Sequence, residues 1–327
     1  FEGLERAGSP RSESSRKGPP DTPAGGSGWT RRFERELFAS HSQTGVRAVS
    51  PLVPVMHHPR HAKANGTLRV SETAAIPALL KDILASKQVS DENGKTYGLH
   101  SEIAAAEGEF IQTLIAENDI QRTLEVGCAF GISSLFICGA LSQKRSPRHL
   151  IIDPHQSSAP WHGIGVLNLK KAGFSFFELI ERPSEIALPE LLRRGELYDF
   201  ALIDGWHTFD HALLDFFYID RMLKPNGIVV FDDVDYAGPR RVVRYISNFK
   251  NYEIIRPENA HGMKHRLREK MVLRMSNLLA RLPEKYTRDL FSDNVFRPDF
   301  SLGINASMVA LRKTAHDERG WDWYAHF

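Results

Sequence analysis

Three carboxylates and a histidine follow two short apolar stretches of this chain. Asp204 and His207 come after the first stretch, and the pair Asp232 and Asp233 comes directly after the second. The 28 positions from Asp204 to Asp232 suit one helical crossover between neighbouring parallel strands. Because the carboxyl ends of parallel strands meet at one edge of a sheet, we expect these side chains to lie close together.

Such a cluster could hold a divalent cation. Three carboxylates in one place repel one another unless a cation lies between them. Oxygen ligands in that number suit Mg²⁺, Mn²⁺ or Ca²⁺, whereas zinc prefers cysteine and histidine. Histidine changes charge near physiological pH, so His207 could accept a proton there. The alternative is structural: the acids end strands or cap the following helix, and His207 is a surface loop residue.

A turn with two glycines precedes these acids in the chain. The segment from Glu125 to Gly131 joins a short apolar run to a longer one, which is the pattern of a strand, a turn and a helix. Gly127 and Gly131 would let the backbone approach a ligand that faces the N–H groups of the helix start. The dinucleotide-binding pattern needs a third glycine where Ala129 stands, which argues against NAD. An ordinary tight turn is the alternative.

This turn resembles the first motif of the class I S-adenosylmethionine-dependent methyltransferases, which is an acid, one residue, a glycine, three residues and a glycine. Glu125, Gly127 and Gly131 fit that motif. The resemblance implies that S-adenosylmethionine lies over the turn, that Asp153 accepts its ribose hydroxyls, and that residues 182–185 contact adenine. A helix cap is the alternative role of Asp153. The implied cofactor-binding residues are Glu125, Gly127, Cys128, Ala129, Gly131, Ser133, Asp153, Ser184 and Asp204.

The acidic block resembles the metal-dependent O-methyltransferases of the caffeoyl-CoA and catechol type and of the macrocin and macrolide-sugar type. By this resemblance Asp204, Asp232 and Asp233 are metal ligands. His207 is the implied general base. The implied function is an S-adenosylmethionine-dependent O-methyltransferase that acts on a hydroxyl of a small molecule with Mg²⁺ or Mn²⁺.

Other functions stay open. A metal-independent class I methyltransferase, directed to nitrogen or oxygen, would use the acids structurally. A non-catalytic module would bind S-adenosylmethionine without transferring its methyl group, and an oxidoreductase is disfavoured by Ala129. Phenolic diols, deoxysugars and polyketide glycosides all remain candidates for the acceptor.

The resemblance implies an α/β fold with a Rossmann-like sheet of seven strands, the last antiparallel, and helices on both faces. Strands are expected at 122–126, 149–153, 177–181, 198–203, 228–231, 252–255 and 307–312. Helices are expected at 71–87, 101–117, 132–141, 209–223 and 240–249. Ser101 is a candidate cap of the second helix, and residues 225–227 are expected to form a turn.

The outer parts of the chain differ from its centre. Residues 1–66 are rich in Ser, Pro, Gly and Arg, so we expect them to be disordered. Residues 67–327 would form the methyltransferase domain, with cap helices within 71–117. A helical insertion is expected at 257–303, where apolar residues recur at helical spacing. It would roof the acceptor pocket, form a dimer contact or lie on a membrane surface.

Composition narrows the classes further. The net charge of +2 is too small to indicate a nucleic-acid enzyme, and the sequence holds no apolar run of about 18 residues that would span a membrane. The two cysteines, Cys128 and Cys138, do not form the framework of a secreted protein, which favours the cytoplasm. Because the chain starts at Phe1 and not at Met, we expect a fragment or a chain with translated upstream sequence. A homodimer is implied by the resemblance alone.

Overall fold

The computed structural model describes residues 77–255, 297–304, 306–325 and 327, together with residues 271, 274–275, 277–278 and 281. All of them belong to one compact unit, Thr67–Phe327. The disorder predicted for residues 1–66 lies outside the described residues, as does most of the insertion predicted at 257–303.

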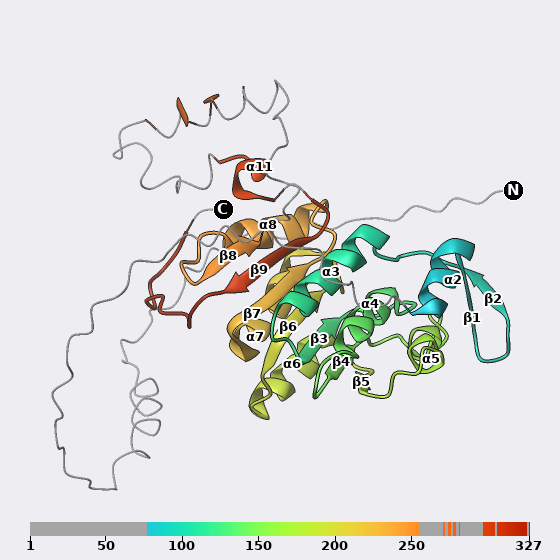
Figure 1. Cartoon of the computed structure of the whole chain (residues 1–327). Coiled ribbons are helices and arrows are strands. Elements are labelled where there is room, and N and C mark those ends of the chain that lie inside the picture. Colours follow the sequence, from blue (N-terminus) through green and yellow to red (C-terminus); the bar gives the residue numbers. More distant parts are fainter. Residues whose placement is uncertain are drawn as a thin grey trace, which may run out of the picture. The chain divides into compact units, whose positions relative to one another are not determined.

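A seven-stranded sheet in the order β5-β4-β3-β6-β7-β9-β8 forms the centre of this unit (Figure 1). Five neighbouring strands are parallel, and β9 runs antiparallel to both β7 and β8. The predicted fold class is confirmed. The strands are β3 Arg122–Val126, β4 Arg148–Ile152, β5 Phe177–Ile180, β6 Tyr198–Ile203, β7 Leu223–Phe231, β8 Tyr252–Ile255 and β9 Val309–Lys313.

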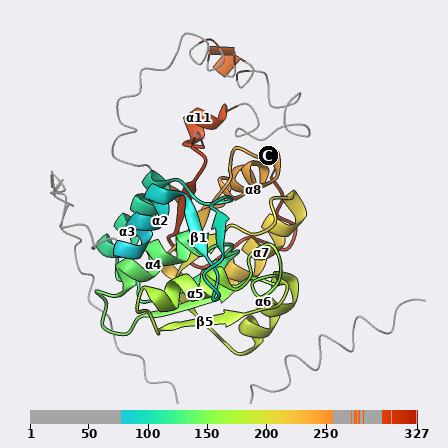
Figure 2. The same ribbon diagram turned by 90° about the vertical axis from the view of Figure 1, so that its right-hand side faces the viewer.

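Helices cover both faces of the sheet (Figure 2). Alternate residues of one strand enter two separate cores, as Leu150 and Ile152 enter one and Ile151 the other. A strand that is buried on both faces reads as a continuous apolar run, which explains why the central strands could be predicted. One face carries α2 Ala78–Ser86, α3 Ala105–Glu117, α4 Ile132–Leu141 and α5 Ile164–Lys171, and the other carries α6 Ser184–Arg193, α7 Phe209–Met222 and α8 Ala237–Ile246.

Three smaller elements complete the described fold. Two short strands, β1 Gln88–Ser90 and β2 Thr96–Gly98, form an antiparallel pair between α2 and α3. The short helix α11 Asp299–Leu302 precedes β9. Within the described residues, no helix is both long enough and apolar enough to cross a membrane.

Two local predictions need correction. The turn expected at 225–227 lies inside β7, where the pairing jumps from Leu223 opposite Tyr198 to Ile228 opposite Phe200, so the turn is a bulge in a longer strand. The predicted Ser101 cap is wrong. Helix α3 begins after Ala104, whose N–H donates to Glu107 Oε2 at 2.7 Å, because a glutamate three residues on can satisfy that free donor.

Candidate active site

The turn between β3 and α4 depends on its two glycines. Gly127 and Gly131 have φ values of 92° and 77°, which favour glycine. A Cβ at Gly127 would lie 2.0 Å from the carbonyl oxygen of Asp204, and one at Gly131 would lie 2.8 Å from the carbonyl oxygen of Gly165. The turn is therefore packed between the loop after β6 and the start of α5.

The motif acid Glu125 is fully buried beneath this turn. Its carboxylate accepts hydrogen bonds from the hydroxyls of Ser133 and Ser134 at the start of α4. His149 Nε2 lies 3.0 Å from Glu125 Oε2, and His149 Nδ1 lies 2.9 Å from the Thr123 hydroxyl. Glu125 and Ser133 thus join β3 and β4 to α4, and their contact with the cofactor stays a prediction.

Asp153, at the end of β4, holds the glycine turn from the other side. Its Oδ2 accepts the backbone N–H groups of Cys128 and Ala129 at 3.1 Å each, and its Oδ1 accepts the N–H of His155 at 2.9 Å. These bonds fix the turn, and ribose binding by Asp153 stays a prediction. Gln156, which the sequence did not single out, donates to the carbonyl oxygen of Ala129 at 3.0 Å and accepts the N–H of Gly165 at 3.0 Å.

Two further predicted cofactor residues lie beside this turn. The Cys128 thiol is buried, and burial and the nearby Glu125 raise its pKa, so it stays protonated and is a small apolar group of the turn. Ser184 is the first residue of α6, and its side chain is hydrogen-bonded to Asp215. No described contact ties Ser184 to the glycine turn, and its role toward adenine stays a prediction.

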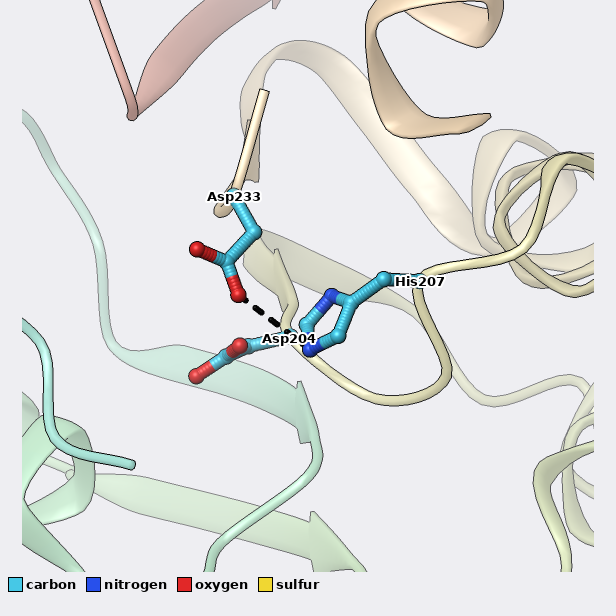
Figure 3. A group of neighbouring side chains, drawn as sticks. All are labelled: Asp204, His207 and Asp233. Carbon is cyan, nitrogen blue, oxygen red and sulfur yellow. Dashed lines mark ion pairs between the residues drawn. The ribbon is translucent and has the colours of Figure 1, made fainter. Parts of the chain in front are cut away.

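Asp204, His207 and Asp233 form a group at the carboxyl edge of the sheet (Figure 3). One ligand atom of each lies within 4.8 Å of the others, and His207 Nε2 is 3.2 Å from Asp233 Oδ2. Asp204 follows β6, and Asp233 follows β7 after one intervening residue. The backbone pairing of these two strands continues past their ends, since the Asp232 N–H donates to the carbonyl oxygen of Ile203 at 3.1 Å. Asp233 has a φ of 52°, an unfavourable conformation that often marks functional residues.

Asp232 does not belong to this group in the part of the chain that the structure describes. It is 7% exposed. Burial, followed by the charge of Glu107 on α3, raises its pKa to about 7. The pKa of Asp204 is also raised well above its usual range, by burial and then by the charges of Asp232 and Glu125. The charges of neighbouring carboxylates therefore make the ionisation of Asp204 and Asp232 harder.

Exposed aromatic side chains surround the group. The Tyr236 ring stacks on His207 with a centroid distance of 5.6 Å and an interplanar angle of 19°. Tyr236 is 58% exposed, and Trp206, which is 65% exposed, lies next to His207 in the chain with its ring 6.1 Å from that of His211. The sequence could not predict that either ring is exposed, since an isolated aromatic residue in a loop is as often packed as exposed.

Known proteins are similar to the central part of this chain. Residues 124–234, from β3 to the end of the Asp233 turn, match the family described as "Methyltransferase domain". The chain is 25% identical over 175 residues to the flavonoid 3',5'-methyltransferase of Vitis vinifera, an alignment that spans 51% of this chain and 69% of that protein. The match identifies residues 124–234 as a methyltransferase domain.

Further proteins similar to this chain carry related names. Caffeoyl-CoA O-methyltransferase 2 of Petunia hybrida is 26% identical over 163 residues, which are 45% of this chain and 63% of that protein. An O-methyltransferase from Bacillus cereus, solved with S-adenosylhomocysteine, is similar over 54% of this chain and 82% of its own, with 17% identity and a TM-score of 0.44. The tomaymycin-synthesis O-methyltransferase of Streptomyces achromogenes, solved with S-adenosylmethionine, shares 19% identity over 58% of this chain and 83% of its own, with a TM-score of 0.43.

Proposed function

We propose that the methyltransferase transfers the methyl group of S-adenosylmethionine to a hydroxyl of a small molecule, with a divalent cation at Asp204 and Asp233 and with His207 as general base. The observation that carries this proposal is the convergence of these three side chains to within 4.8 Å. They stand next to the glycine turn, because Gly127 touches the backbone of Asp204. The two plant relatives are named as a flavonoid methyltransferase and a caffeoyl-CoA O-methyltransferase, which supports a hydroxyl acceptor.

The residues present fit a hard divalent cation. Carboxylate oxygens are the ligands that Mg²⁺ and Mn²⁺ prefer. The raised pKa of Asp204, caused by burial and by neighbouring carboxylates, shows that negative charge is crowded at this edge of the sheet. A cation would relieve that repulsion. Asp232 lies at the same edge outside this group, and its direct binding to the cation stays a prediction.

The chemistry then depends on removing one proton. A neutral hydroxyl is a weak nucleophile toward a sulfonium methyl group, and a bound cation lowers the pKa of a hydroxyl that binds to it. His207 would accept that proton at Nδ1, while its Nε2 donates to Asp233 Oδ2 at 3.2 Å and so holds the ring in place. The remaining work is positioning, since the methyl carbon and the attacking oxygen must be held in line.

A second candidate function needs no cation. The same 3.2 Å contact between His207 and Asp233 is a histidine–carboxylate pair, and such a pair can orient and strengthen a base by itself. A metal-independent methyltransferase would use His207 and Asp233 in this way, with Asp204 as a structural residue.

Calorimetry on the purified full chain separates the two candidates. S-adenosylhomocysteine is titrated first, and Mn²⁺ is then titrated into the saturated protein. Asp204→Asn is compared with Asp210→Asn, which removes an exposed carboxylate at the start of α7. We expect saturable Mn²⁺ binding that Asp204→Asn weakens and Asp210→Asn leaves unchanged.

Methyl transfer to catechol, a simple vicinal diol, is measured in the same preparations with and without Mn²⁺. If the protein binds the cofactor and its rate of methyl transfer is the same with and without Mn²⁺, the metal-independent candidate is favoured. Failure to bind S-adenosylhomocysteine would contradict both. Binding of the cofactor without transfer to any hydroxyl compound would leave a non-catalytic binding module.

A further inference from the structure

An apolar groove starts at His207 and runs along helix α8. It is lined by the loop 207–209, by Ala237, Gly238 and Arg241 of α8, and by Phe327. Its volume is about 500 Å³, which lies in the range of small-molecule sites. His207 therefore borders two features, the acidic group on one side and this groove on the other.

The floor of the groove is held by a close contact of loop and helix. A Cβ at Gly238 would lie 2.5 Å from the carbonyl oxygen of His207 and 2.8 Å from the backbone nitrogen of Phe209. The first turn of α8 therefore lies directly against the loop that carries the candidate base. Because His207 itself lines the groove, a ligand there would lie beside it.

The outer wall of the groove is Phe327, from the last described part of the chain, which lies beside α8 (Figures 1 and 2). Arg241 donates to the carbonyl oxygen of Phe327 at 3.2 Å. The Phe327 ring packs on Tyr245 at a centroid distance of 4.9 Å and is nearly parallel to the Phe209 ring, at 5.9 Å and 11°. Both the backbone and the ring of Phe327 are therefore held by contacts.

The segment that precedes Phe327 in the chain is also held by packing. Trp323 packs on Phe249 at 5.3 Å and on Tyr245 at 6.0 Å, and the Arg319 guanidinium lies 3.4 Å from the centre of the Phe249 ring. These contacts bind the terminal segment along α8, so the position of Phe327 is set by packing. In contrast, Trp321 of the same segment is 99% exposed.

We propose that this groove binds the apolar part of the methyl acceptor while the reacting hydroxyl lies at Asp204, His207 and Asp233, and that Phe327 is a specificity-determining residue. The inference rests on the proposed function. Apolar walls favour hydrocarbon or aromatic groups and offer little to a sugar ring, whose hydroxyls would lose water without gaining partners. The acceptor class is therefore a hydroxy compound with an uncharged apolar substituent, rather than a deoxysugar.

A series of catechols with growing alkyl groups tests the inference. Catechol, 4-methylcatechol and 4-propylcatechol present the same hydroxyls and differ only in the apolar part. Two quantities are measured for each with the full chain: kcat/KM for methyl transfer, and Kd by calorimetry in the presence of S-adenosylhomocysteine and Mn²⁺. A fully buried methylene is worth about a factor of four, so in this open groove we expect 4-propylcatechol to exceed catechol by about tenfold in both.

Three variants locate the effect. Phe327→Ala should remove most of the tenfold preference by raising KM for 4-propylcatechol. Phe327→Leu keeps an apolar wall and should retain most of the preference. Trp321→Ala changes an exposed aromatic residue of the same segment and should behave as the wild type. Thermal denaturation and S-adenosylhomocysteine binding check that each variant is folded.

The outcomes separate the groove from the proposed function. If methyl transfer is independent of alkyl length, or if Phe327→Ala leaves its dependence on alkyl length intact, the result would contradict the proposed role of the groove and would still support an O-methyltransferase. Binding that strengthens with alkyl length and weakens in Phe327→Ala, without any transfer, would support the groove and contradict the function. Equal binding of all three catechols without transfer would overturn both.

Discussion

Asp215 of α7 is a buried carboxyl beneath the loop that carries His207. It is 1% exposed, and its Oδ1 has no hydrogen-bond partner among the described residues. Its Oδ2 lies 3.9 Å from the position that a Cβ on Gly205 would take. Burial raises the pKa of Asp215 from 3.8 to about 6, although the hydrogen bond from Ser184 acts in the opposite direction. We therefore expect ionisation of Asp215 to destabilise the fold.

The sign follows from proton binding. Because the pKa is higher in the folded state, the folded protein binds more protons than the unfolded chain between about pH 4 and pH 6. The free energy of unfolding should therefore fall as pH rises through this window. The change in pKa from 3.8 to about 6 corresponds to about 3 kcal/mol. An asparagine carries no charge but leaves an unpaired amide, which costs about 1 kcal/mol. Asp215→Asn should thus stabilise the protein by roughly 2 kcal/mol at pH 7 and should change its stability little at pH 4.

Urea unfolding of the full chain between pH 4 and pH 8 measures both effects. Asp210→Asn, at an exposed position of the same helix, is the comparison variant: hydrogen bonds at the helix start lower the pKa of Asp210, so this variant should lose stability at neutral pH and not in acid, opposite in sign to Asp215→Asn. Equal stability of Asp215→Asn and the wild type at pH 7, or an unchanged slope between pH 4 and pH 6, would refute the reasoning. Loss of stability in Asp215→Asn would show that the carboxylate has a partner that the described residues do not supply.

Three further predictions concern the site and the sheet. His207→Gln should slow methyl transfer by about 10²-fold or more with little change in Mn²⁺ affinity; a matching loss of Mn²⁺ binding in calorimetry would make His207 a ligand instead of the base. Gly127→Ala should abolish S-adenosylhomocysteine binding, because its Cβ would lie 2.0 Å from the carbonyl oxygen of Asp204, and an unchanged affinity would contradict this packing. Lys313→Met would leave Asp220 buried without the ion pair at 3.1 Å, and should lower the free energy of unfolding by about 3–5 kcal/mol in urea. A loss below about 1 kcal/mol would show that the pair is dispensable.

The elements around the cofactor turn could be predicted because their apolar runs are uninterrupted. Helix α4 has the bounds Ile132–Leu141 expected from the sequence, since every one of its residues is buried. Helix α8 begins three residues earlier than expected, at Ala237. Its first turn carries Gly238, which the sequence treats as a helix breaker, and the reason for that glycine is a contact with the loop at His207.

The sequence could predict which strands end at the site, but not which side chains point into it. The rule that parallel strands release their next residues at one edge placed Asp204 near the pair Asp232 and Asp233. It could not decide between the two members of the pair, because consecutive residues of a strand point in opposite directions. The choice depends on Asp233, whose φ of 52° departs from the strand and directs its side chain to His207. A single backbone angle of this kind leaves no trace in the amino-acid pattern.

Contacts between distant segments explain what the sequence did not show. Phe327 lies 118 positions after Phe209, so no periodicity links the two rings that line the groove. The same holds for Gly127 and Asp204, which join the cofactor turn to the acidic group through backbone atoms. Because of that contact, a change in the turn also moves Asp204, and a loss of activity at Gly127 cannot be assigned to the cofactor alone. Cofactor binding and Mn²⁺ binding must therefore be measured as separate steps in every variant of this edge of the sheet.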